Sequence, residues 1–140
     1  MQPKFAELRA PDIIPALFPV GEEANGHLWR YLFETALLKS AYQDIDPDLN
    51  FYRANDLPIT LLALAHAEKY VSTAERLYRY HFRRGTSGHA VDGVERFAFL
   101  LSGVDPISAI SRRIEQLAEQ TTDPQSLLRC YESALSLIHI

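Results

Sequence analysis

The ten residues Asp56–Ala65, DLPITLLALA, constrain the fold more strongly than any other stretch of the sequence. Asn55, Asp56 and Pro58 form a combination that is typical of a helix N-terminus. The Asn or Asp side chain accepts a hydrogen bond from a free backbone amide, and proline has no amide to leave unpaired. The residues after Pro58 are almost all apolar, so apolar side chains cover every side of the predicted helix. The sequence therefore predicts a domain packed around a helix that begins at Asp56.

The size and charge of the chain limit what it can do. With 140 residues it can bury about two thirds of its unfolded surface in one core. Its 14 Lys and Arg are outnumbered by 18 Asp and Glu, so no overall positive field would hold a nucleic acid. The single cysteine, Cys130, excludes an internal disulfide and a thiolate metal cluster, and we interpret it as core filler. No apolar run approaches the roughly 20 residues of a membrane span, and no signal peptide is recognisable. We expect a soluble cytoplasmic protein with no transmembrane segment.

The first 25 residues are predicted to form an extended, proline-rich arm. Four prolines lie within residues 3–19, and each disfavours helix in the residue before it, so a long helix cannot form there. The apolar side chains of the arm are too numerous for a free tail, so they should lie against a partner or another piece of the same chain. These side chains belong to Ile13, Ile14, Leu17, Phe18 and Val20.

Several further segments have the period of an amphipathic helix. One helix is expected from Glu34 to about Tyr42, while residues 28–33 fit either its first turns or a strand. Its proposed buried face comprises Leu28, Trp29, Leu32, Phe33, Ala36 and Leu37. Later helices are expected at residues 91–101, from Asp105-Pro106 to about residue 118, and from Asp123-Pro124 to about residue 138, the last two forming an antiparallel hairpin. The fold class is therefore α+β and predominantly α-helical, with about five helices.

Two strand-like runs, Tyr70–Thr73 and Leu77–Arg83, predict a short β-hairpin or strand pair. The second run alternates, which places Tyr78, Tyr80 and Phe82 on a packed face and Arg79, His81 and Arg83 on a cationic one. A basic, glycine-bearing loop, residues 84–88, follows. Arginine, glycine and hydroxyl side chains together suit an anion such as a diphosphate. The alternative is an ordinary solvated strand face.

Asp44, Asp46 and Asp48, in DIDPDLN, fit either a metal site or a turn. A calcium loop beginning at Asp44 would need glycine at its sixth position and a carboxylate at its twelfth. Leu49 and Asn55 stand there instead. The proline and the high density of Asp favour a turn between two helices. We therefore assign no metal ligands in this chain.

Asp56 has two interpretations at this stage. A carboxylate fixed at the mouth of a buried helix is partly desolvated, which is how a general base is positioned. The same residue can also serve only as a helix cap. Local sequence leaves both open.

The order of segments in this chain resembles a known family. The runs GHLWRYLFETALLKSAYQDI and NDLPITLLALAHAEKYVSTAERLYRYHFRRGTSG contain, in order, a W-x-x-L-F segment, an acidic residue opening a helix, A-x-K-Y-V, L-Y-x-Y and a loop bearing glycine and serine. This order is similar to the C-terminal part of bacterial family 2 glycosyltransferases, nucleotide-sugar enzymes of the GT-A fold. The similarity covers residues 26–88, which would be the acceptor-side segment, and residues 89–140 would be a helical scaffold.

The resemblance implies roles for particular residues. Asp56 matches the Asp that deprotonates the acceptor hydroxyl, although Asn55 stands where the family usually has Glu. Trp29 falls on the acceptor side. A full-length enzyme would bind a nucleotide-sugar and an acceptor glycan, with Mg²⁺ or Mn²⁺ as cofactor. The residues that match the part closing over the donor diphosphate are His81, Arg83, Arg84 and Ser87.

The nucleotide-binding βαβ half of the GT-A fold has no counterpart in the sequence. We therefore expect this chain to be a fragment or C-terminal region of a glycosyltransferase in polysaccharide or glycan synthesis, inactive alone. The alternative is a non-enzymatic helical interaction module, in which Asp56 only caps its helix and the apolar termini meet a protein partner or a second copy.

Overall fold

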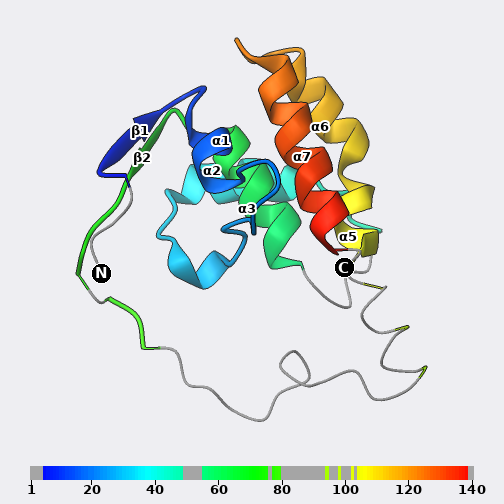
Figure 1. Ribbon diagram of the computed structural model, residues 1–140, viewed down its shortest axis with the longest axis horizontal. Coiled ribbons are helices and arrows are strands. Elements are labelled where there is room, and N and C mark those ends of the chain that lie inside the picture. The colour runs from blue at the N-terminus through cyan, green and yellow to red at the C-terminus, as the bar shows by residue number, and fades with distance from the viewer. Residues whose placement is uncertain are drawn as a thin grey trace.

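The computed structural model describes residues 5–48, 55–75, 77–79, 94, 98, 102 and 104–138. Within them it contains α-helices, one 3₁₀ turn and a two-stranded antiparallel sheet, which confirms the predominantly helical α+β class (Figure 1). No helix of the described residues is long and apolar enough to cross a membrane. In chain order the elements are β1 (Glu7–Arg9), α1 (Ile13–Leu17), η1 (Leu28–Arg30), α2 (Thr35–Gln43), α3 (Asp56–Ala65), β2 (Lys69–Val71), α5 (Val104–Ala109), α6 (Ser111–Ala118) and α7 (Pro124–Ile138).

Helix α3 lies at the centre of the molecule, as its all-apolar sequence predicts. It begins at Asp56, and every side chain from Pro58 to Leu64 is buried. Helices α1, α2 and α5 and the turn η1 all pack against it, and Figure 1 shows it enclosed between them. A helix with no polar face is stable here because its neighbours remove nearly all of its surface from water.

The N-terminal segment is not only an extended arm. Its prolines leave room for the short helix α1, and Ile13, Ile14, Leu17 and Phe18 from this region are buried in the common core. Their cover is therefore this chain's own α3 and α7, against which α1 packs. Val20, at 61% exposure, is the one apolar side chain of the predicted set that stays in water.

The strand pair has a different partner from the one predicted. Strand β2 pairs with β1, in the register Leu8 opposite Tyr70, while residues 77–79 form no strand and residues 80–83 lie outside the described part of the chain. The sheet leans on the core through Leu8 and Tyr70, which both pack against it. Glu7 on the other face pairs with Lys69 and Arg9, at 3.1 Å in each case. The strand pair is confirmed, but its partner strand is β1, and the second predicted strand does not begin at Leu77. The prediction assumed that strands close in sequence pair with each other.

The helix expected from Glu34 is confirmed as α2, but residues 28–33 do not extend it. They form η1 and then an extended segment, in which Leu32 is 91% exposed. Ala36, in the first turn of α2, is exposed too. The buried face proposed for Leu28–Leu37 is confirmed for Phe33 and Leu37, which pack against the core, and was wrong for the exposed residues Trp29, Leu32 and Ala36. The physical reason is that the chain before α2 is held on α3 by contacts described below, which divert it from the axis of α2.

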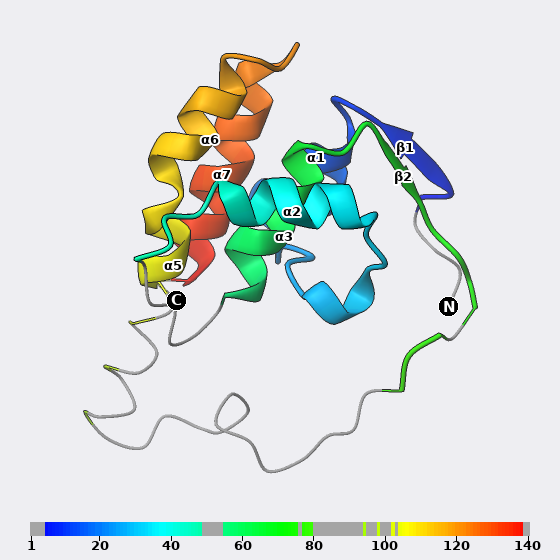
Figure 2. The same ribbon diagram turned by 180° about the vertical axis from the view of Figure 1, so that it is seen from behind.

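The C-terminal helices follow the prediction with one interruption. The helix expected after Asp105 breaks at Ile110 into α5 and α6, and α7 begins where Asp123 Oδ1 accepts a hydrogen bond from the Ser126 amide at 3.1 Å. Helices α6 and α7 pack as an antiparallel hairpin beside α1 and α3 (Figures 1 and 2). Cys130 is 2% exposed, as expected of core filler. Buried residues on the predicted inner face of α5 and α6 are Ile107, Ile110, Ile114 and Leu117.

Only two residues of the helix predicted at residues 91–101 are described. Val94 and Ala98 are helical, in agreement with the prediction. Val94 is 84% exposed and Ala98 is exposed too, so these two side chains do not form the buried face that was expected of them.

Candidate functional site

Asp56 occupies the first turn of α3 and its side chain is half-buried. Its carboxylate forms no hydrogen bond or ion pair with any other described residue, and Asn55, the N-cap, makes no side-chain capping bond. The predicted helix start is therefore confirmed, but the predicted capping bond is absent here. The positive end of the helix dipole stabilises a negative charge at this position. Asp56 is thus an ionisable oxygen acceptor at a helix end, and its lone pairs are not used by any other described residue.

The segment before η1 is fixed onto this same end of α3. Gly26 is buried, and a side chain at this position would clash with Leu57 Cδ1 and lie 3.3 Å from Leu57 Cα. Glycine allows this close approach, whereas a larger residue would require the Leu57 side chain to move and the two backbones to shift slightly apart. The buried hydroxyl of Thr60 donates a hydrogen bond to the Gly26 carbonyl at 3.0 Å. Figures 1 and 2 both show η1 beside the N-terminal end of α3.

Three aromatic rings gather on η1. The ring centroids of His27 and Trp29 are 5.8 Å apart and those of Trp29 and Tyr78 are 5.3 Å apart, with interplanar angles of 23° and 28°. Tyr78 comes from the segment after β2, so the stack joins two distant parts of the sequence. Trp29 is 39% exposed and Tyr78 is 59% exposed. We call His27, Trp29 and Tyr78 the aromatic platform.

The guanidinium of Arg30 lies beside the aromatic platform. The guanidinium carbon of Arg30 lies 5.2 Å from the Trp29 ring centroid, within the range of a cation–π interaction. Arg30 Nη1 donates a hydrogen bond to Asn25 Oδ1 at 3.0 Å. The backbone of Asn25 is itself anchored, because its amide donates to the Leu17 carbonyl at 2.9 Å and its carbonyl accepts from the Tyr31 hydroxyl at 2.6 Å.

Tyr31, whose hydroxyl donates a hydrogen bond to the Asn25 carbonyl, packs against the core. Its ring packs against Phe33 and, edge-on, against Tyr70. Burial, and to a lesser degree the neighbouring Tyr70, raises the pKa of the Tyr31 phenol well above its ordinary value. The hydroxyl therefore stays protonated and remains a donor to Asn25 at any physiological pH.

The residues gathered here have complementary chemistry. Aromatic faces bind the apolar C–H face of a sugar or another planar group, and they are rigid enough to do so at low entropic cost. An unpaired carboxylate accepts hydrogen bonds from hydroxyl groups and can take a proton from one of them. The end of α3 that carries Asp56 and contacts η1 can therefore hold a polyhydroxylated ring and act as a base.

The structure places only some of the residues predicted for the site. Asp56 and Trp29 are brought to the same end of α3 by the packing of Gly26 on Leu57. Tyr78 was predicted to lie on the packed face of a strand, but it is exposed and stacks on Trp29. The four residues predicted for the donor diphosphate lie outside the described residues, namely His81, Arg83, Arg84 and Ser87.

An ionic cluster that was not predicted from the sequence lies at the end of α3 opposite Asp56. Asp44, at the C-cap of α2, lies 2.6 Å from His66 Nε2 and 2.7 Å from Arg113 Nε. The Arg113 Nε atom is buried and forms an ion pair without hydrogen-bond alignment. The cluster joins α2, α3 and α6, whose relative positions a sequence does not disclose. The turn predicted for DIDPDLN is confirmed, because α2 ends at Gln43 and the Asp48 amide donates to Asp46 Oδ1 at 2.9 Å.

No protein-family model, no curated protein and no solved structure matches this chain. The functional interpretation therefore rests on the geometry of the site and on the resemblance of its sequence motifs.

Proposed function

We propose that this chain is the acceptor-side region of an inverting glycosyltransferase that moves a sugar from a nucleotide-sugar to an acceptor hydroxyl. The observation that carries the proposal is the contact between Gly26 and Leu57. It brings a partly exposed aromatic platform to the same end of α3 as a half-buried carboxylate that has no partner among the described residues. An acceptor sugar stacked on the platform would present a hydroxyl to that carboxylate.

In the proposed reaction Asp56 takes the proton of the acceptor hydroxyl while the hydroxyl oxygen attacks the anomeric carbon of the donor. The bond from the anomeric carbon to the phosphate oxygen breaks, and the nucleoside diphosphate leaves with the bonding electron pair. The motif resemblance assigns His81, Arg83, Arg84 and Ser87 to this leaving group. The nucleotide-binding half, with its Mg²⁺ or Mn²⁺, would be contributed by sequence outside this chain.

The alternative of a helical interaction module receives less support from the fold. It rested on Asp56 acting only as a helix cap and on apolar side chains at both ends of the chain that would meet a partner. Ile13, Ile14, Leu17 and Phe18 are instead buried in the core of this chain.

The test is the substitution Asp56→Asn in an enzyme that unites this region with a donor-binding half. Asn keeps the shape of the side chain and cannot accept the proton. We expect turnover, measured as release of nucleoside diphosphate in the presence of acceptor, to fall by at least about 100-fold, the typical effect of losing a general base. Circular dichroism would show that folding is retained.

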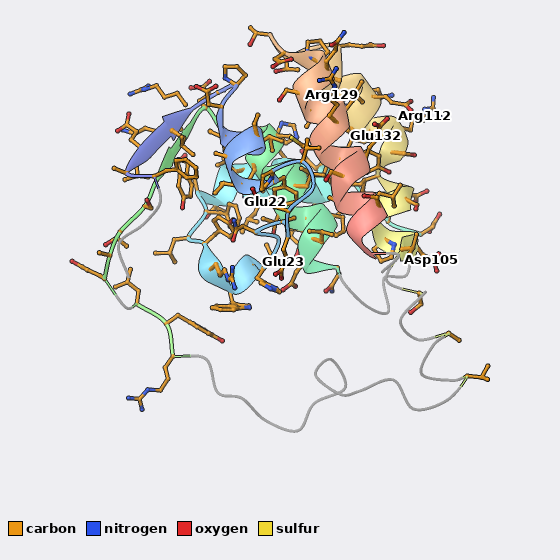
Figure 3. The ribbon with its side chains drawn as sticks, viewed as in Figure 1. Glu22, Glu23, Asp105, Arg112, Arg129 and Glu132 are labelled. Atoms are coloured by element: carbon orange, nitrogen blue, oxygen red, sulfur yellow. The ribbon has the colours of Figure 1, made fainter. Side chains whose placement is uncertain are left out.

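Asp105→Asn is the matched control. Asp105 is also an acidic residue in the first turn of a helix, α5, and it is exposed at some distance from η1 (Figure 3). Its substitution should leave turnover unchanged. Near-normal turnover of the Asp56→Asn enzyme would remove Asp56 from the mechanism and, with it, the proposed function.

A further inference from the structure

The guanidinium of Arg30 is an exposed cation without a carboxylate partner among the described residues. Four ion pairs are present in that part of the chain, and they involve Arg9, Lys69, His66 and Arg113. Arg30 uses one donor, Nη1, on the neutral amide of Asn25. No other described residue uses the remaining guanidinium donors, which suit a ligand that carries negatively charged oxygens.

The backbone of Asn25, the hydrogen-bond partner of this cation, is anchored in the core. It is anchored through its amide to Leu17 and through its carbonyl to the buried Tyr31 hydroxyl. The Trp29 ring lies against the guanidinium and limits its freedom from another side. A charge held in advance beside an aromatic surface binds a ligand with less loss of conformational entropy than a free surface arginine.

We propose that the acceptor recognised at the aromatic platform is an anionic sugar, a pyranose ring that bears a carboxylate or a phosphate group. The inference rests on the proposed function and specifies its substrate class. The ring stacks on the platform formed by His27, Trp29 and Tyr78, and the anionic group accepts hydrogen bonds from Arg30.

A nucleotide also combines a planar ring with anionic oxygens, but the site suits it less well. The carboxylate of Asp56 at the same end of α3 has no cation partner among the described residues and would repel a diphosphate with its several negative charges. A sugar with a single anionic group can turn its hydroxyls toward Asp56 and its charge toward Arg30. The platform is therefore assigned to the acceptor.

The chain offers a direct reporter for this proposal, because Trp29 is its only tryptophan. The 140-residue chain is titrated with methyl β-D-glucuronide, glucose 6-phosphate, the neutral methyl β-D-glucoside and UMP, while the intrinsic fluorescence of Trp29 is followed. We expect at least one anionic sugar to bind about tenfold or more tightly than the neutral glucoside, as charge-assisted hydrogen bonds allow. The preference should weaken as salt is added.

Two arginine variants separate this site from general surface charge. Arg30→Gln should abolish the preference for the anionic sugar and leave the affinity for the neutral one within about twofold, since stacking is retained. Arg112→Gln removes another exposed cation, on α6 and away from η1, and should change neither affinity (Figure 3). Arg30→Lys keeps the charge without the two-pronged donor and should retain part of the preference.

Equal affinities for anionic and neutral sugars, or tighter binding of UMP than of every sugar, would overturn the proposal. So would a preference that survives Arg30→Gln in a folded chain. These outcomes concern only the class of acceptor. If Asp56→Asn still abolished transfer, the glycosyltransferase function would stand while the anionic acceptor was rejected.

Discussion

At the scale of single residues, Thr60 and Gly26 determine where the aromatic platform lies. A buried hydroxyl with 0% exposure in an otherwise apolar helix needs a partner, and the Gly26 carbonyl is that partner. Neither residue was singled out from the sequence. A lone threonine among leucines and alanines is the signal that could have found the contact, because such a hydroxyl is costly to bury unpaired.

Thr60→Val tests this contact. Valine has the shape of threonine without the donor, so the Gly26 carbonyl would remain buried and unpaired. We expect the free energy of unfolding, measured by urea denaturation, to fall by about 1–3 kcal/mol. The emission of Trp29 should also change as its segment loosens from α3.

Thr35→Val provides the comparison. Thr35 is exposed at the first position of α2 and should change stability by no more than about 0.5 kcal/mol. If Thr60→Val were equally harmless, the Gly26 segment would not depend on this hydrogen bond, and the position of the platform would need another explanation.

At the scale of elements, the cluster of Asp44, His66 and Arg113 holds the end of α3 that lies away from Asp56. The side chain of Asp44 is only 9% exposed and contacts both His66 and Arg113. It stands at the C-cap of α2, where the helix dipole disfavours a negative charge, so the partners are needed to offset that position. Three helices meet at this one carboxylate.

Asp44→Asn removes the charge and nearly preserves the shape. Arg113 would lose its counter-ion and His66 the carboxylate that it contacts. We expect the free energy of unfolding to fall by about 2 kcal/mol, less than for a fully buried pair because both partners retain some contact with water. Thermal denaturation followed by circular dichroism measures it. Sugar binding at the far end of α3 should not change.

Asp46→Asn serves as the reference substitution. Asp46 is exposed in the same turn, and an asparagine there can still accept the hydrogen bond of the Asp48 amide. The Asp46→Asn variant should have the same melting temperature as the unaltered chain. Equal melting temperatures for Asp44→Asn and Asp46→Asn would show that the cluster contributes nothing to the packing of the three helices.

Helices were predictable from the sequence where capping residues or helical periodicity marked them. The start of α3 at Asp56, the start of α7 at Asp123-Pro124 and the α6–α7 hairpin follow from capping residues and helical periodicity. The partner of β2 was not predictable, because β1 lies about 60 residues away and pairs through a short run with no strand signature of its own. Contacts between distant segments carry no local signal.

The same limit applies to the whole molecule and its candidate site. Asp56 and Trp29 were identified from the order of motifs, since each lies in a recognisable local pattern. Arg30, His27 and Tyr78 belong to the site because of two tertiary contacts. Gly26 packs against Leu57 of α3, and Tyr78, from the segment after β2, stacks on Trp29 of η1. The alternation that put Tyr78 on a buried strand face was a real pattern, but tertiary packing gave the residue a different environment.

The central claim is that one ligand engages both the aromatic platform and the N-terminal end of α3. A ¹H–¹⁵N correlation spectrum of the chain, titrated with methyl β-D-glucuronide and methyl β-D-glucoside, tests it most directly. We predict that the single indole signal of Trp29 and the backbone amide signals of Asp56 and Leu57 shift together, with one dissociation constant. An indole signal that shifts while both amides stay in place, or shifts confined to the α6–α7 hairpin, would contradict the account.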